Sequence, residues 1–146
     1  MKNNPNFSER LKELMYDCGD IKSERLGAEI GVSGQSVRGW CEGTQSISLS
    51  HLLKLADYFN CSLEFLLARS DIECDYTPRP CPPFYERFRE VMKEKGVTRY
   101  RMAKESKIKD SYFTAWSRGA DPNVDSVMEA ADYLNVSIDY LVGRDR

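Results

Sequence analysis

The sequence predicts an all-α fold made of two tandem five-helix domains joined by a proline-rich linker. The main observation is an internal repeat, because residues 7–69 and 84–144 follow one pattern. Both copies carry the words Trp-x-x-Gly, Ala-Asp-Tyr and Asn-x-Ser in the same order. In both, apolar residues recur three or four positions apart, the spacing of one helix face. We therefore assign residues 1–69 to the first domain, 70–83 to the linker and 84–146 to the second domain.

An apolar stripe predicts the first helix of each copy, at about residues 7–17 in copy one. The stripe there consists of Phe7, Leu11, Leu14 and Met15. In copy two it consists of Phe84, Phe88, Val91 and Met92. The offset between the copies shortens by a single position twice, once between these stripes and the paired tryptophans Trp40 and Trp116, and once more before Ala56 and Ala131. Both length changes fall between helices, where loops tolerate them.

The second and third helices are short and joined by a tight turn. We expect them at about residues 23–30 and 34–41 in copy one, and at about 98–106 and 110–117 in copy two. Their inward-facing side chains are Val37, Trp40, Phe113 and Trp116.

The caps and turns of these helices differ between the copies. Thr98 is a good N-cap, whereas Lys22 is not, so Ser23 is expected to cap the second helix of copy one. Gly31 suits the left-handed conformation that a short turn between helices often requires. Lys107 occupies that position in copy two and is expected to be strained there.

The last two helices of each copy follow the shared Ala-Asp-Tyr signature. They are expected at about residues 49–59 and 63–68 in copy one, and at about 124–134 and 138–142 in copy two. Ser62 and Ser137 are natural N-caps for the final helices. Between the copies, Pro78, Pro80, Pro82 and Pro83 predict a stiff spacer of polyproline II geometry over residues 70–83.

Composition excludes several classes of protein. No apolar run approaches the roughly 20 residues of a membrane span, so we expect a soluble cytoplasmic protein that contacts no membrane. The five cysteines include no Cys-x-x-Cys pair, which predicts reduced thiols and no metal site. With one histidine and no glycine-rich phosphate loop, we expect no catalysis, no cofactor and no small-molecule substrate.

Charge is unevenly distributed along the chain, although the net charge is only −2. The segment from Lys93 to Lys109 carries seven basic residues against two acidic ones, Glu94 and Glu105. A local excess of cations is the electrostatic footprint of a surface that binds phosphate. Around the second helix of copy one, acidic residues outnumber basic ones.

The repeated runs resemble the Cro/C1-type helix-turn-helix family, which includes phage repressors and regulators of the xenobiotic-response-element class. In copy one the resemblance rests on Leu26-Gly27-Ala28, Gly31-Val32-Ser33 and Trp40-Cys41-Glu42-Gly43. In copy two it rests on Met102-Ala103, Ile108 and Trp116-Ser117-Arg118-Gly119. The resemblance implies two lambda-repressor-like domains, double-stranded DNA as partner, a nucleoid-associated location and a role as a transcriptional repressor. In such a motif the later helix enters the major groove of DNA.

The resemblance and the side-chain chemistry select candidate contact residues. In copy one they are Ser23, Ser33, Gln35, Ser36 and Arg38. In copy two they are Arg99, Lys107, Lys109, Ser111, Tyr112 and Thr114. Glutamine can bond adenine and arginine can bond guanine, each through two hydrogen bonds. By resemblance, Arg99 stands where the family contacts the DNA backbone. Asp110 would repel phosphate unless it caps its helix or accepts from cytosine, and we expect the cap.

Two functions remain open from the sequence. In the first, the copies form a covalent pseudo-dimer that reads successive major grooves in a sequence-specific manner. In the second, the chain is an antitoxin- or anti-repressor-like interaction module, in which one copy binds a protein partner or forms a homodimer. For any single candidate residue, the alternative is an ordinary solvated helix face.

Overall fold

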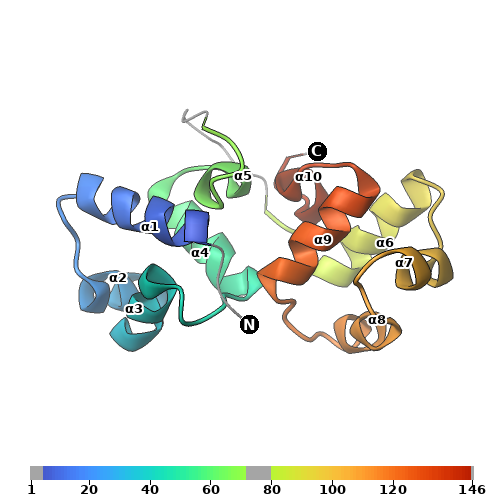
Figure 1. The fold of residues 1–146 in the computed structure, drawn as a ribbon, viewed down its shortest axis with the longest axis horizontal. Coiled ribbons are helices and arrows are strands. Elements are labelled where there is room, and N and C mark those ends of the chain that lie inside the picture. Colours follow the sequence, from blue (N-terminus) through green and yellow to red (C-terminus); the bar gives the residue numbers. More distant parts are fainter. Residues whose placement is uncertain (1–4, 72–79, 146) are drawn as a thin grey trace. The chain divides into compact units, whose positions relative to one another are not determined.

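The computed structural model describes residues 5–71 and 80–145, and these residues form ten helices and no strand (Figure 1). The all-α prediction is therefore confirmed for this part of the chain. The chain divides into two compact units, Met1–Tyr76 and Thr77–Arg146, which we call unit 1 and unit 2. The division falls within the predicted linker 70–83. Residues 72–79 of that linker, with Pro78, lie outside the described residues.

Each unit contains five of these helices, and the order of helix lengths is similar in the two. The helices of unit 1 are α1 (Pro5–Asp17), α2 (Ser23–Ile30), α3 (Gly34–Glu42), α4 (Leu49–Phe59) and α5 (Leu63–Leu66). The helices of unit 2 are α6 (Phe84–Glu94), α7 (Arg99–Glu105), α8 (Asp110–Ser117), α9 (Val124–Leu134) and α10 (Ile138–Val142). The predicted boundaries lie close to these bounds throughout.

The apolar stripes form the core of each unit. In unit 1 the fully buried side chains include Phe7, Leu11, Leu26, Val37 and Leu52. In unit 2 the core is aromatic: the ring centroid of Phe88 lies 5.4 Å from Phe84, 5.6 Å from Phe113 and 5.3 Å from Trp116. Leu14 and Phe84, which the stripes include, are only half-buried.

The repeated Asn-x-Ser word ends one helix and begins the next. Asn60 and Asn135 adopt the left-handed conformation, with φ of 54° and 57°, at the C-caps of α4 and α9. Directly after each corner, Ser62 and Ser137 accept hydrogen bonds of 3.0 Å from the backbone N–H groups of Phe65 and Tyr140. Asparagine tolerates positive φ and serine is a favoured N-cap, so the word specifies the corner between the last two helices.

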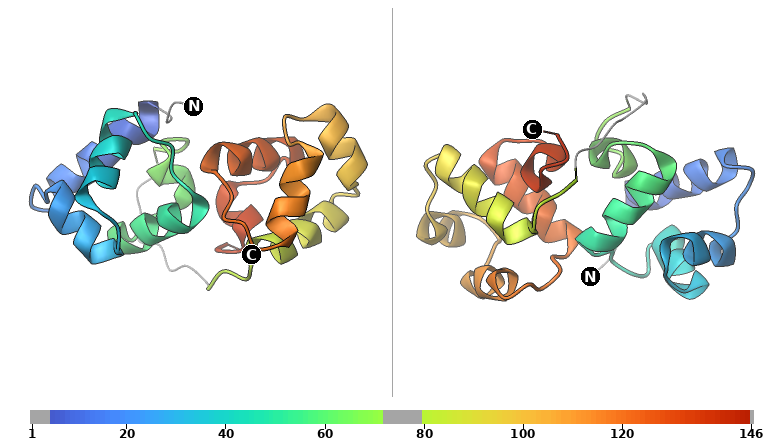
Figure 2. Two further views of the ribbon diagram at one scale, coloured as in Figure 1. Left: turned by 90° about the horizontal axis from the view of Figure 1, so that it is seen from below. Right: turned by 180° about the vertical axis from the view of Figure 1, so that it is seen from behind.

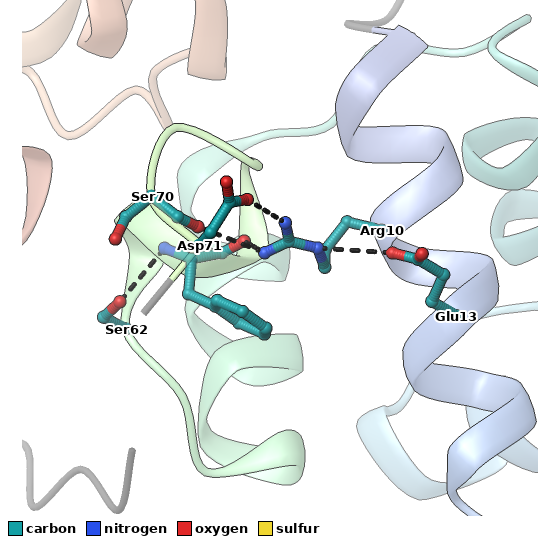
Figure 3. Close-up of polar contacts among 6 residues, drawn as sticks. Arg10, Glu13, Ser62, Ser70 and Asp71 are labelled. Atoms are coloured by element: carbon teal, nitrogen blue, oxygen red, sulfur yellow. Dashed lines mark hydrogen bonds and ion pairs between the residues drawn. The ribbon is translucent and has the colours of Figure 1, made fainter. Parts of the chain in front are cut away.

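An arginine of the first helix binds the last helix in both units. Arg10 lies 4.0 Å from the ring centroid of Phe65 and donates to the carbonyl oxygen of the same residue (Figure 3). It also donates to the carbonyl of Ser70 and to the carboxylate of Asp71, at 3.3 and 3.1 Å. These bonds hold the start of the predicted linker against α1.

Arg87 takes the corresponding place in unit 2, at the matching position of the repeat. It lies 4.6 Å from the ring centroid of Tyr140 and donates two hydrogen bonds, of 3.2 and 3.0 Å, to the Tyr140 carbonyl. The Cδ atom of Pro82 lies 2.9 Å from where a Cβ on Gly143 would be. The other end of the predicted linker therefore packs on unit 2.

The two tight turns are built differently. In unit 1, Gly31 has φ of 83° at the C-cap of α2, as predicted. In unit 2 the predicted strain at Lys107 is wrong, because the residues with positive φ do not include it. There the hydroxyl of Ser106 donates to the Met102 carbonyl at 2.7 Å and accepts from the Ile108 N–H at 3.1 Å. In unit 2 the hydrogen bonds of the Ser106 side chain therefore stabilise the turn, where unit 1 uses the left-handed conformation of Gly31.

The N-caps of the second helix of each unit differ in how well they agree with the sequence: the cap predicted for α7 is present, and the one predicted for α2 is not. Thr98 caps α7 by accepting from the Arg101 N–H at 3.1 Å. The prediction that Ser23 caps α2 is wrong, because Ser23 is the first residue of that helix. Lys22 holds the N-cap position without a side-chain hydrogen bond.

Gly27 is required by a close approach between α2 and the turn that follows it. A Cβ on Gly27 would lie 2.6 Å from the Val32 carbonyl oxygen, which is a backbone atom. A Cβ on Gly39, in α3, would meet only the side chain of Gln45, at 2.7 Å. The contact at Gly27 can be relieved only by moving the backbone of the turn. The contact at Gly39 can be relieved by moving the flexible Gln45 side chain.

We therefore expect Gly27→Ala to destabilise unit 1 by up to about 2 kcal/mol. Overpacking costs about 1–3 kcal/mol, and the better helix propensity of alanine offsets about 1 kcal/mol of that. Gly39→Ala is the matched control and is expected to be neutral or stabilising. Urea unfolding followed by Trp40 fluorescence, in a Trp116→Phe background, measures unit 1 alone. Equal shifts in the two variants would contradict the close-approach argument.

Candidate nucleic-acid interface

Helices α2 and α3 lie next to each other in unit 1 (Figure 2), and polar side chains of α3 reach the surface. Leu26 of α2 and Val37 of α3 are fully buried, so the packed sides of both helices are fixed. Gln35 and Arg38 of α3 lie away from these packed sides and are exposed, whereas Ser36 is half-buried. Two of the predicted contact residues thus share one accessible helix surface.

Ser33 has a defined structural role at the start of α3. It is the N-cap, and its hydroxyl oxygen accepts from the Ser36 backbone N–H at 3.1 Å. The Ser33 and Ser36 hydroxyls also lie 3.1 Å apart. Because that oxygen is committed to the cap, Ser33 has less capacity to accept from a ligand. Ser23, half-buried at the start of α2, lies outside this polar face of α3.

A carboxylate of α2 holds the arginine of α3. Glu24 forms an ion pair and hydrogen bond with Nη1 of Arg38. This hydrogen bond lowers the pKa of the Glu24 carboxyl below its ordinary value. A Cβ on Gly34 would lie 2.8 Å from Cδ of Glu24, so the missing side chain at Gly34 leaves the space that Glu24 occupies. The sequence pattern did not reveal this contact, because glutamate and arginine are far apart along the chain and lie on different helices.

Helices α7 and α8 form the corresponding surface in unit 2. Lys107, Lys109 and Ser111 are exposed, and Lys109 is the N-cap residue of α8. Within the described ranges, neither lysine forms an ion pair, although the backbone N–H of Lys107 donates to Glu129 at 3.1 Å. Tyr112 is half-buried, with its ring centroid 6.0 Å from that of Trp116.

Arg99 bridges α7 and α8. Its Nε donates to the Asp110 carboxylate at 2.7 Å, and its Nη2 donates to the Asp110 carbonyl at 3.1 Å and to the Thr114 hydroxyl at 2.9 Å. The prediction that Asp110 caps α8 is therefore wrong, since its carboxylate accepts from Arg99 instead. This hydrogen bond lowers the pKa of the Asp110 carboxyl and raises that of Arg99. Arg99 and Thr114 are engaged with each other and with Asp110.

The family comparison covers part of this architecture. Residues 20–66 match the family model described as Helix-turn-helix. The matched segment contains α2, α3, α4 and α5, including the whole polar face of α3. Unit 1 therefore holds a helix-turn-helix domain, a kind of domain found in DNA-binding regulators of transcription. Searches of curated proteins and of solved structures found no match.

Other kinds of site are not evident in the part of the chain that the structure describes. No helix among those residues has the length and apolar character needed to cross a membrane. Nor do the same residues contain a group of three or more His, Cys, Asp or Glu side chains that could hold a metal ion.

Proposed function

We propose that the chain is a sequence-specific DNA-binding transcriptional regulator, a repressor, that uses two linked helix-turn-helix domains in successive major grooves. The observation that carries the proposal is the matched helix-turn-helix of unit 1 together with its geometric repeat in unit 2. Trp40 and Trp116 are both buried, and Arg10 and Arg87 both bind the last helix of their unit. Equivalent side chains thus make equivalent contacts at matching positions of the repeat.

In this proposal α3 and α8 are the helices that enter the major groove. Gln35 and Arg38 of α3 have the chemistry to read base edges, adenine for glutamine and guanine for arginine. Ser33 and Ser36 lie at the start of α3, and Ser23 at the start of α2, where a phosphate can approach.

Unit 2 supplies most of the charge. Lys107, Lys109 and Ser111 are suited to phosphate, since they are exposed at the turn and the first turn of α8. Tyr112 can touch a thymine methyl group from the same helix. Arg99 binds Asp110 and Thr114 of α8 and so holds this helix against α7.

A linker in extended geometry is long enough for half-sites one turn of DNA apart. The whole of segment 70–83 in polyproline II geometry would reach roughly 40 Å, at about 3.1 Å per residue. Both ends of this segment are held against their units and do not add to its reach. Arg10 bonds Ser70 and Asp71 at one end, and Pro82 packs on Gly143 at the other. From Asp71 to Pro82 the reach falls to about 34 Å. This is comparable with one turn of B-DNA, about 34–36 Å.

Selection from a randomised duplex pool by the intact protein, at about 0.1 M salt, tests the proposal. We expect two enriched blocks about 10 base pairs apart, centre to centre. A single block would assign the reading of bases to one unit. No enriched block would overturn the proposal.

The second candidate is a module in which one unit binds DNA and the other binds a protein partner or a second copy. The acidic surface of α2 favours it, because Glu24 and Glu29 each pair with one of the nearby arginines, Arg38 and Arg25, and so reduce the charge available to phosphate. A single selected block would support this candidate. The slope of affinity on salt would then be shallow, since few phosphates are neutralised.

A further inference from the structure

Each unit has an inter-helix ion pair, but the helices that supply the cation and the anion are exchanged, and the paired positions are not equivalent in the repeat. In unit 1 the carboxylate comes from the first helix of the motif, at Glu24, and the guanidinium from the second, at Arg38. In unit 2 the guanidinium comes from the first helix, at Arg99, and the carboxylate from the second, at Asp110. Arg38 lies in the second turn of α3, at the position that Thr114 holds in α8, whereas Asp110 is the first residue of α8. Gly34 leaves room for the carboxylate in unit 1, and Asp110 supplies it at that position in unit 2.

The two arginines differ in which groups remain available to a ligand. Arg99 uses Nε and Nη2 in three hydrogen bonds to α8. Arg38 uses Nη1 alone, and within residues 5–71 and 80–145 its Nε and Nη2 have no hydrogen-bond partner. Five N–H donors in a planar fork can serve a carboxylate on one edge and a base on the other. Arg38 is therefore restrained and has four N–H groups still able to donate, whereas Arg99 has only the two N–H groups of Nη1 left.

We propose that Glu24 is a positioning residue that holds Arg38 for contact with a guanine in the half-site of unit 1, and that unit 2, which has Thr114 at the position of Arg38, makes no such contact. This inference rests on the proposed function and deepens it. It follows that the two half-sites differ in sequence, with the preference for guanine confined to one of them. Glu24 fixes that preference although it need not touch DNA itself.

The matched control for Glu24 is Glu29. Both are exposed glutamates of α2 that pair with an arginine, but Glu29 pairs with Arg25 one turn away on the same helix. Glu24→Ala and Glu29→Ala remove the same charge from the same helix. Both variants are expected to bind all duplexes more tightly, because a repulsion toward phosphate is removed. Only Glu24→Ala is expected to alter the choice of base.

The experiment compares binding of the intact wild-type chain and its variants to the selected duplex and to a duplex with the critical guanine replaced. Arg38→Ala is expected to lose about 5- to 100-fold of the preference for guanine. Glu24→Ala is expected to lose about 2- to 10-fold, the effect of freeing one long side chain. The variant with both substitutions should match Arg38→Ala, because Glu24 acts through Arg38.

The outcomes separate this inference from the function on which it rests. If wild type enriches no duplex, the proposed function fails and the inference fails with it. If wild type enriches a block but Glu24→Ala keeps the full guanine preference, as Glu29→Ala does, the inference alone is overturned. An unchanged preference in Arg38→Ala would overturn it as well. Circular dichroism of each variant establishes that the helices remain folded.

Discussion

Phe88→Ala is expected to unfold unit 2 and to leave unit 1 folded. The Phe88 side chain is fully buried and contacts the rings of Phe84, Phe113 and Trp116. Truncating such a phenylalanine costs about 3–5 kcal/mol. A domain has about 0.05–0.15 kcal/mol of stability per residue, so a unit of this size has roughly 3–10 kcal/mol in total, and this truncation removes a large part of it.

The expected signal is a loss of roughly half of the helical circular dichroism, since the two units contain helices of similar total length. Fluorescence of Trp116 should shift to the exposed value while that of Trp40 stays buried, as read in single-tryptophan backgrounds. Phe7→Ala is the mirror variant and should reverse the two signals. Tyr100→Ala, at a side chain that is 72% exposed, is the control and should change neither. Simultaneous unfolding of both tryptophan environments would show one cooperative unit instead of two.

The fold was predictable because its determinants are local and occur twice. Phe7 and Leu11, like Phe88 and Val91, lie at helical spacing. The turn between the last two helices of a unit is specified by a short motif such as Asn60-x-Ser62. Caps and turns depend on residues that are near neighbours in the chain, so sequence alone constrains them. The wrong prediction at Lys107 also concerned a local feature. A tight turn between helices can use a residue of positive φ, as at Gly31, or side-chain hydrogen bonds to the backbone, as Ser106 provides in unit 2.

The site was less predictable because its chemistry depends on pairs that are distant in sequence. The resemblance and the residue types identified Arg38 and Arg99 as candidates, but not their partners. The Glu24–Arg38 and Arg99–Asp110 bridges join helices across a turn, and the side chain that is absent at Gly34 matters as much as those present. A cation is therefore not a phosphate contact merely because it is charged and exposed. Its remaining hydrogen-bond donors decide what it can bind.

Cleaving the linker is expected to weaken binding to the selected two-block duplex by about 100- to 10,000-fold. A tether converts the second binding event into an intramolecular one, at an effective concentration in the millimolar range for a short linker. A protease site placed within residues 72–79 allows the same folded protein to be measured before and after cleavage. The described contacts of Arg10 and Pro82 lie outside that segment and are kept.

Two controls isolate the tether. Wild type without the protease site should keep its affinity through the same treatment. A duplex that carries only the unit 1 block should bind equally well before and after cleavage, because it engages one unit in either case. Equal binding to the two-block duplex before and after cleavage would mean that only one unit contacts DNA. The other would then be free for a partner, since a tether strengthens binding only when both of its ends hold the same molecule.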